Sequence, residues 1–282
     1  MQILDGKAFA ADYRLKLAEK VKNLKETDNI VPGLAVVIIG EDPASQIYVR
    51  NKMKACEAAG IKSFNVVLPE TITQSEAEEE VKKLAENIEV DGIIVQLPLP
   101  KKFDEKRILS LIPVEKDVDG LSSENLGKLL KGEDSLISCT PYGIIELLKG
   151  YGVKFAGKTA VVLGRSNMVG KPVAALLLRE NATVTVCHSK TENIASYTKN
   201  ADILVAAIGK AKFVTADMVK DGAVVVDVGI NRIDGKIYGD VDYESVKDKC
   251  SLITPVPGGV GPMTVTMLLQ NTFNACIKNR RK

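Results

Sequence analysis

The sequence of 282 residues is poor in the side chains from which metal sites and hydrolytic triads are built. It contains a single histidine, His188, so a histidine-based zinc site or a Ser-His-Asp triad is hard to assemble. Its five cysteines are scattered and show no C-x-x-C spacing, which favours free thiols in a reducing cytoplasm over disulfides or a zinc site. We therefore expect a cytoplasmic protein without a metal centre.

Long apolar runs and a strong charge imbalance are also absent. No apolar run approaches the roughly 20 residues of a membrane-spanning helix, and the N-terminal segment lacks the features of a signal or transit peptide. The net charge of +2 does not suggest the concentrated basic face that nucleic-acid binding needs. We expect neither a membrane nor a nucleic acid as partner, and a length that suits one large or two smaller domains.

The first part of the chain alternates between apolar runs and helical patterns. Short apolar runs typical of buried parallel strands predict strands at 34–40, 64–68 and 91–97. Helices are expected at 7–25, 43–60, 75–87 and 105–111, with linking helices over 121–150 that are interrupted at Cys139-Thr140-Pro141. The order β-α-β-α-β over residues 33–100 predicts a parallel sheet.

The second half restarts this alternation. Strands are expected at 158–163, 182–187, 202–208, 223–228 and 251–256, and helices up to Glu180, after Thr215 and over about 263–278. The order strand, glycine turn, helix, strand is typical of a Rossmann fold. We therefore predict an α/β protein of two three-layer domains with a cleft between them, the second a Rossmann-like doubly wound parallel sheet. The expected domains are 1–120, completed by the C-terminal helix at about 263–278, and 121–282.

The helix that follows Asp42-Pro43 carries a candidate proton-transfer pair. Tyr48 and Lys52 lie one helical turn apart, where a phenol can orient an amine and help to tune its pKa. The alternative is a solvated lysine above a half-buried tyrosine. Gln96 stands at the carboxyl end of a strand, where ligands of open parallel sheets bind, and is either a cap for backbone groups or a site residue. Turn chemistry alone explains either aspartate of Asp117-Val118-Asp119-Gly120.

The loop Gly164-Arg165-Ser166-Asn167-Met168-Val169-Gly170 fits neither standard glycine motif, because its glycines are too widely spaced for G-x-G-x-x-G or a Walker A loop. A plain tight turn is the alternative to a nucleotide site. A helix N-terminus nevertheless attracts phosphate, and Arg165 and Ser166 add donors. The next strand ends in Cys187-His188-Ser189-Lys190 without the acidic residue usual in NAD enzymes, which favours NADP. We interpret His188 as a scaffold or phosphate-side residue and not as a catalyst.

Five sequence blocks follow one another in a fixed order. They are Ser45-x-x-Tyr48-x-x-x-Lys52, Val95-Gln96-Leu97-Pro98-Leu99-Pro100, Asp117-Val118-Asp119-Gly120, Gly164-Arg165-Ser166-x-x-Val169-Gly170 and Pro255-Val256-Pro257-Gly258-Gly259-Val260-Gly261-Pro262-Met263-Thr264. Over nearly the whole chain this set resembles the bifunctional methylenetetrahydrofolate dehydrogenase/methenyltetrahydrofolate cyclohydrolase family. The resemblance implies NADP-dependent hydride removal from 5,10-methylenetetrahydrofolate, and hydrolysis of the methenyl cation to 10-formyltetrahydrofolate, in one cleft between the domains.

The resemblance also implies roles for individual residues. Lys52 is the principal catalytic residue, with Tyr48 and Gln96 beside it and Asp119 binding the pterin. The implied NADP contacts are Gly164, Arg165, Ser166, Ser189 and Ile230. The implied folate contacts are Tyr48, Lys52, Gln96, Leu97, Asp119, Pro257, Gly258 and Gly259. The family further implies a homodimer formed through the nucleotide domain.

The two reactions place different demands on these residues. Hydride removal needs little more than positioning against the cofactor. Hydrolysis needs a base, and a lysine with its ordinary pKa of ~10.4 is a poor one at neutral pH. A bound cation disfavours the charged amine, which brings the pKa toward the useful range of about 7–8.

Three other functions compete with this one. A short-chain dehydrogenase also uses Tyr-x-x-x-Lys, but there the pair follows the nucleotide loop. A shikimate- or amino-acid-type dehydrogenase shares the two-domain plan but explains Gln96 and Asp119 less well. A folate- or nucleotide-binding protein without turnover does not require Lys52. Two X-Pro bonds, Leu99–Pro100 and Val256–Pro257, are candidates for the cis form because of their loop setting.

Overall fold

The computed structural model describes residues 2–281, so Met1 and Lys282 lie outside the described part of the chain. The chain divides into two compact units. Unit 1 consists of Met1–Ala11, Lys128–Asp134 and Ser138–Thr264, and unit 2 of Asp12–Gly127, Ser135–Ile137 and Val265–Lys282. The two longest helices, α1 (Gly6–Asp28) and α10 (Val260–Arg280), each begin in unit 1 and continue into unit 2.

Unit 2 is built on a three-stranded parallel sheet of order β3-β2-β4, which confirms the predicted β-α-β-α-β arrangement. Its strands are β2 (Gly33–Ile39), β3 (Lys62–Leu68) and β4 (Gly92–Val95). All residues of the central strand β2 are buried, because helices cover both faces of a parallel sheet. One face packs against α3 (Gln74–Glu86) through Ala77, Val81 and Leu84. The helix α2 (Pro43–Ala59) connects β2 to β3.

The ends of α2 follow from its sequence. Asp42 is the N-cap, and its carboxylate accepts a hydrogen bond from the backbone N–H of Ser45 at 2.7 Å. Pro43 occupies the first turn, where its missing N–H costs nothing. The helix ends at Gly60, whose φ of 72° places it in the left-handed region. The predicted start of the helix that carries Tyr48 and Lys52 is therefore confirmed.

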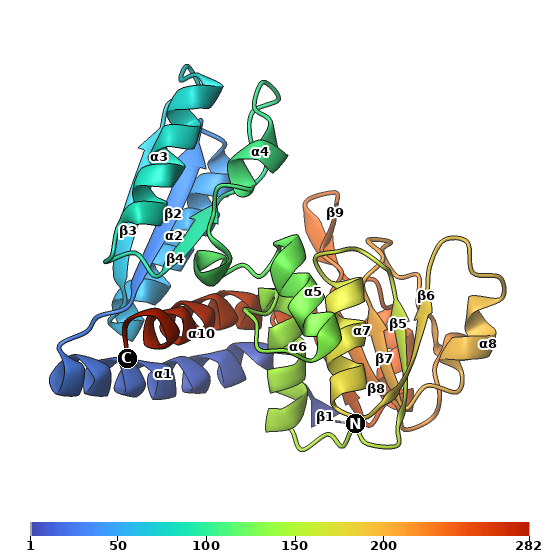
Figure 1. Ribbon diagram of the computed structural model, residues 1–282. Helices are drawn as coiled ribbons and strands as arrows, with labels where there is room; N and C mark the ends of the chain where they lie inside the picture. The colour runs from blue at the N-terminus through green and yellow to red at the C-terminus, as the bar shows by residue number, and fades with distance from the viewer. Residues whose placement is uncertain (1, 282) are drawn as a thin grey trace. The chain divides into compact units, whose positions relative to one another are not determined.

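Unit 1 contains a six-stranded sheet of order β1-β11-β8-β7-β5-β6, in which all pairs are parallel. Its strands are β1 (Gln2–Ile3), β5 (Thr159–Leu163), β6 (Thr183–Cys187), β7 (Ile203–Ala206), β8 (Val224–Asp227) and β11 (Leu252–Ile253). The helices α6 (Cys139–Gly150) and α7 (Gly170–Arg179) pack together on one face (Figure 1). The other face packs against α8 (Ile194–Thr198), a 3-10 turn (Ala216–Met218) and α9 (Tyr243–Val246). The predicted Rossmann-like parallel sheet is confirmed.

Four local predictions need correction. The interruption at Cys139-Thr140-Pro141 is wrong: α6 starts at Cys139, and Pro141 lies in its first turn, where proline is tolerated. The chain instead breaks between α5 (Ser123–Lys131) and α6. The helix expected after Thr215 is only the 3-10 turn, because the chain enters β8 soon afterwards. The last strand covers only Leu252–Ile253 of the expected 251–256, since the chain leaves the sheet at Thr254.

The proline bonds give the fourth correction. Val256–Pro257 is cis, as expected, whereas the second cis bond is Leu97–Pro98 and not Leu99–Pro100. The chain bends at residues 97–98, directly after β4, and is past this bend at Leu99. The sequence analysis also missed the antiparallel hairpin of β9 (Asn231–Ile233) and β10 (Lys236–Tyr238), although its Asp234-Gly235 turn is a recognisable hairpin signal.

The five cysteines are free, as the sequence predicts, and all five are buried. Burial raises the pKa of Cys56 to about 12 and that of Cys250 to about 11, so these thiols stay protonated and act as small apolar side chains. In the part of the chain that the structure describes, no helix has both the length and the apolar character needed to cross a membrane.

A buried ion pair fixes the end of α10 within unit 2. Arg280 donates to both carboxylate oxygens of Asp91, from Nε at 2.7 Å and from Nη2 at 2.5 Å. Asp91 is 1% exposed and also accepts the backbone N–H of Gly33 at 2.8 Å. This carboxylate at the start of β4 therefore depends on Arg280 for its charge partner.

We expect Arg280→Met to lower the free energy of unfolding by roughly 3 kcal/mol, because the substitution leaves the Asp91 carboxylate buried without its cation. The matched control is Arg281→Met, since the contact of Arg281 with Asp28 at 3.3 Å is largely exposed and such pairs are worth about 1 kcal/mol or less. Urea denaturation of both variants measures the difference. Equal stability of the two variants would show that the pair contributes nothing to the fold.

Candidate functional site

The amine of Lys52 and the amide of Gln96 are in direct contact in unit 2. Lys52 Nζ donates to Gln96 Oε1 at 3.0 Å, although the two residues are 44 positions apart in the sequence. Gln96 follows β4 directly, and its backbone N–H still pairs with Val37 O at 2.8 Å, so the strand ladder sets its position. Its Nε2 donates to Leu97 O at 2.7 Å. Both ends of the amide are thus engaged, and the oxygen faces the lysine.

Tyr48 lies one turn before Lys52 on α2, and its side chain is 49% exposed. Lys52, Gln96 and Leu97 are half-buried. An amine with a fixed acceptor beside a partly accessible phenol can hold or move a proton next to a ligand. The structure therefore brings Lys52 and Gln96 together and places Tyr48 on the same helix.

The two aspartates of the Asp117-Val118-Asp119-Gly120 turn differ in their surroundings. Asp117 is buried and accepts hydrogen bonds from the backbone of Leu121 and Ser122 and from Asn125 Nδ2. It therefore has the turn role that the sequence allowed for either aspartate. Asp119 is half-buried.

A residue of α10 that the sequence analysis missed supports this turn. Asn271, 1% exposed, donates from Nδ2 to Val118 O and to Ile137 O, both at 2.8 Å. Its only sequence signal is a polar residue within a predominantly apolar helix. The contact holds the peptide immediately before Asp119.

The loop between β5 and α7 in unit 1 has the close packing of a phosphate-binding turn. A Cβ at Gly164 would lie 2.2 Å from Ala207 O, and one at Gly170 would lie 2.3 Å from Gly164 O, so neither position has room for a side chain. Ser166 Oγ accepts the backbone N–H groups of Val169 and Gly170 at 3.1 and 3.4 Å. Arg165 is exposed, and both Arg165 and Ser166 precede α7, whose N-terminal dipole favours an anion.

A pocket of about 440 Å³ lies beside this loop. It is lined by Gly164, Arg165 and Ser166, by His188 and Ser189 after β6, and by Ala207, Ile208, Lys210 and Phe213 after β7. Burial raises the pKa of Cys187, which also lines the pocket, so its thiol adds an apolar surface. The pocket therefore joins the carboxyl ends of three neighbouring strands, the position where open α/β sheets bind ligands.

His188 shapes the turn at the rim of this pocket. Its Nδ1 accepts the backbone N–H of Lys190 at 3.2 Å, and its own N–H donates to Thr191 Oγ1 at 2.9 Å. These local contacts agree with a scaffold role and present Ser189 and Lys190 as exposed side chains. The segment after β6 carries no carboxylate at these positions.

The remaining predicted residues lie elsewhere in unit 1. Ile230 follows β8 and is 58% exposed, but it does not line the pocket beside Gly164. Pro257, Gly258 and Gly259 form a turn after β11, which the start of α1 contacts through a 2.9 Å hydrogen bond from Lys7 N to Gly258 O.

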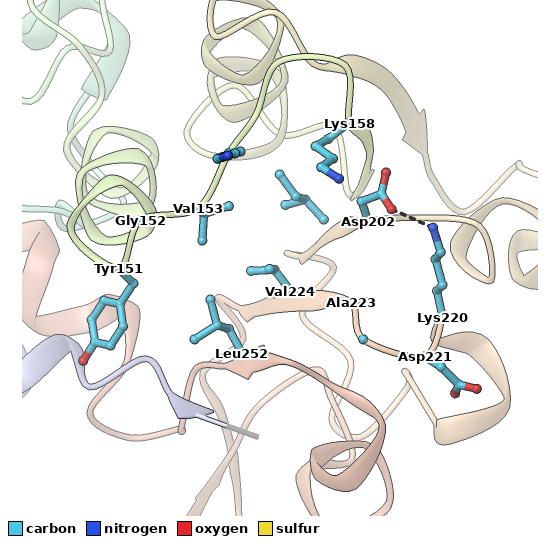
Figure 2. Close-up of a pocket in the computed structure, with 13 residues that line it drawn as sticks. Tyr151, Gly152, Val153, Lys158, Asp202, Lys220, Asp221, Ala223, Val224 and Leu252 are labelled. Carbon is cyan, nitrogen blue, oxygen red and sulfur yellow. Dashed lines mark hydrogen bonds and ion pairs between the residues drawn. The ribbon is translucent and has the colours of Figure 1, made fainter.

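Figure 2 shows a second pocket of unit 1, of about 210 Å³, which lies at the amino ends of the strands. Its lining residues Lys158, Asp202 and Ala223 directly precede β5, β7 and β8. Figure 2 shows Lys220 paired with Asp202, at 2.6 Å, so this lysine is already neutralised. Because dinucleotides bind at the carboxyl ends of parallel strands, this pocket does not compete for the cofactor.

Comparisons with known proteins agree with this arrangement. Residues 4–119 match the tetrahydrofolate dehydrogenase/cyclohydrolase catalytic domain, and residues 138–280 match the NAD(P)-binding domain of the same family. The bifunctional protein FolD of Campylobacter hominis is 55% identical over 100% of this chain and 99% of its own length.

Solved structures give the same result. A bifunctional FolD dehydrogenase/cyclohydrolase from Campylobacter jejuni superposes with a TM-score of 0.95 at 49% identity, over 99% of both chains. The enzyme from Trypanosoma brucei, complexed with NADP and an inhibitor, has a TM-score of 0.91 at 41% identity, over 99% of this chain and 98% of that one. This chain therefore belongs to the tetrahydrofolate dehydrogenase/cyclohydrolase family.

Proposed function

We propose that this chain is a bifunctional enzyme of one-carbon folate metabolism. It oxidises 5,10-methylenetetrahydrofolate to 5,10-methenyltetrahydrofolate with NADP, and it hydrolyses that product to 10-formyltetrahydrofolate. The observation that carries the proposal is the 3.0 Å contact between Lys52 and Gln96 in a chain that matches both domains of the family. A dehydrogenase of the shikimate or amino-acid type explains Gln96 and Asp119 less well.

The residues beside Gly164 fit a dinucleotide. The N-terminus of α7 favours a phosphate through its dipole, and Arg165 and Ser166 line the pocket and supply donors. Ser189 and Lys190 suit a 2′-phosphate, which a carboxylate in their place would repel. When bound, NADP supplies the acceptor for the hydride that leaves the bridge carbon of the folate. The protein has only to position the two partners, since the flanking nitrogens stabilise the cation that forms.

Hydrolysis draws on Lys52. A water molecule attacks the methenyl carbon and passes one proton to the amine of Lys52 in its neutral form. The hydroxyl of the adduct then loses its proton as the bond from this carbon to N5 breaks and N5 takes up a proton, which leaves the formyl group on N10 and releases one proton overall. Gln96 orients the amine, because its oxygen accepts one N–H and so fixes the directions of the other N–H bond and of the lone pair on that nitrogen. Tyr48 lies one turn away and completes the polar surface at this point.

Folate binding is assigned to residues near this amine and to the glycine turn of unit 1. The carboxylate of Asp119 can accept two parallel N–H bonds from the aminopyrimidine edge of the pterin. Leu97, Pro257, Gly258 and Gly259 provide apolar and backbone surface for a flat ligand. These assignments make Tyr48, Lys52, Gln96 and Asp119 the residues that touch the reacting folate, with Ile230 on the NADP side.

We further propose that residues 1–120, with the helix at about 263–278, form the folate-binding domain and 121–282 the NADP-binding domain. We also propose that the protein is a cytoplasmic homodimer formed through the nucleotide domain. The five free cysteines support a reducing compartment. Within residues 2–281, the edge strand β6 pairs on one side only, and exposed Val186 on β6 and exposed Leu178 on the neighbouring helix α7 support a contact between copies there.

One absorbance assay tests the function and the cofactor together. We expect purified protein to form NADPH from 5,10-methylenetetrahydrofolate and NADP, with a higher kcat/KM for NADP than for NAD, because Arg165, Ser189 and Lys190 favour the extra phosphate. Lack of turnover with either cofactor would refute the function. Turnover of NAD at least as efficient as that of NADP would refute only the charge argument.

Lys52→Met is expected to separate the two activities. Hydrolysis of methenyltetrahydrofolate should fall by at least about 100-fold, since a general base contributes 10²–10⁴, while measurable hydride transfer remains. The control is Lys54→Met, which removes an exposed lysine of the same helix and should leave both rates unchanged. Equal and complete loss of NADP and folate binding in the Lys52 variant would instead make Lys52 structural.

Asp119→Ala is expected to raise the Kd for the folate substrate by about tenfold or more, because a hydrogen bond to a charged group is worth roughly 1.5–3 kcal/mol. The Kd for NADP should not change. Glu115→Ala, which truncates an exposed carboxylate of the preceding turn, serves as the control in the same titration. An unchanged folate Kd for the Asp119 variant would remove this residue from the pterin site.

A further inference from the structure

Two buried carboxylates lie behind the dinucleotide pocket of unit 1, and the sequence analysis did not single out either. Asp240, which follows β10, is 0% exposed, and Asp227, the last residue of β8, is 3% exposed. The described part of the chain pairs neither carboxylate with a cation. All but one of their hydrogen-bond donors are backbone N–H groups, so the two side chains organise the main chain around them.

Asp240 holds the wall of the pocket. Its Oδ2 accepts the N–H groups of Ile208 and Gly209 at 2.7 and 2.9 Å, and its Oδ1 accepts that of Lys210 at 2.9 Å. Ile208 and Lys210 line the pocket. Three successive N–H groups thus point at the carboxylate and are unavailable to a ligand. The phosphates of a dinucleotide must therefore find their donors on the Gly164–Gly170 side.

Asn231 is the one side chain that donates a hydrogen bond to Asp240 within the described residues. Its Nδ2 donates to Asp240 Oδ1 at 2.9 Å and to Tyr238 O at 3.3 Å. Asn231 is the first residue of β9 and directly follows Ile230, the expected NADP contact. The carboxylate that fixes the 208–210 wall is therefore also bonded to the residue next to Ile230.

Asp227 links this wall to the turn after β8. Its Oδ1 accepts the N–H groups of Gly229 and Asp240 at 2.9 and 2.8 Å, and its Oδ2 accepts that of Val241 at 2.9 Å. Burial raises the pKa of Asp227 to about 6, with a further contribution from the charge of Asp240, whereas the three backbone N–H groups act in the opposite direction. These three N–H groups favour the ionised form of Asp227, which accepts all three bonds.

Two glycines make room for the carboxylates. A Cβ at Gly229 would lie 2.3 Å from Asp240 Oδ1, and one at Gly239 would lie 1.8 Å from Asp227 Oδ2. Each acidic side chain therefore packs directly on the backbone beside the other. Two acidic side chains are thus buried side by side, and neither glycine position has room for a side chain.

We propose that Asp240 is a positioning residue for the dinucleotide. It fixes residues 208–210, which form one wall of the pocket. Together with Asp227 and Asn231, it also fixes the position of this wall relative to the turn at Ile230. Hydrogen bonds from three consecutive N–H groups to one carboxylate fix the orientation of those peptides before the ligand binds. Such preorganisation lowers the cost of binding, and its loss weakens affinity without a lost ligand contact. The inference rests on the proposed use of NADP in this pocket.

The test is the Kd for NADPH measured by fluorescence titration, without any folate. We expect Asp240→Asn to raise this Kd by about tenfold or more, because the amide cannot accept at both positions and turns its NH₂ toward existing donors. Asp242→Asn is the matched control, since Asp242 is partly exposed and its contact with Lys212 is 3.6 Å. Hydrolysis of methenyltetrahydrofolate, assayed without NADP, should stay within about twofold of the wild-type rate in both variants.

Asn231→Ala keeps the proposal testable if Asp240→Asn does not fold. It removes one donor of Asp240 and should raise the Kd for NADPH about two- to fivefold, with kcat at saturating NADP unchanged. An unchanged Kd in a folded Asp240 or Asn231 variant would overturn the proposal, as would an equal fall in hydrolysis and affinity. A wild-type protein that binds no NADPH would instead refute the proposed function.

Discussion

The account depends on one hydrogen bond, from the amine of Lys52 to the amide oxygen of Gln96 at 3.0 Å. A free lysine side chain samples many rotamers, and this contact selects one of them. The contact exists because α2 follows the carboxyl end of β2, while Gln96 directly follows the neighbouring strand β4. Parallel pairing of β2 with β4 thus brings two residues that are distant in sequence to one edge of the sheet.

The same constraint organises unit 1. The pocket beside Gly164 is formed by the segments after β5, β6 and β7, which end at one edge because the strands are parallel. Buried carboxylates fix the loops that follow these strands. Asp240 orients residues 208–210, and Asp227 orients the turn that contains Gly229. A parallel sheet therefore supplies the position of the pocket, and buried carboxylates behind the loops supply the shape of the pocket.

Much of this arrangement could be predicted from the sequence because it depends on local patterns. The apolar runs located every long strand, Asp42-Pro43 located the start of α2, and the absence of an acid after Cys187 indicated the cofactor. The misses have physical causes. Asp240 is about thirty positions away from residues 208–210 in the sequence, and only the folded chain brings them into contact. Pro141 does not interrupt a helix, because it lies in the first turn of α6, where proline is tolerated.

The most direct test is a crystal structure of the complex with NADP and an unreactive folate analogue, in which the distance from Lys52 Nζ to the atom that stands for the bridge carbon is measured. The account predicts that the amine lies within direct or single-water reach of that atom, about 3–5 Å, with Gln96 Oε1 still accepting its hydrogen bond. An amine that points into solvent, with the folate bound away from Lys52 and Gln96, would contradict it.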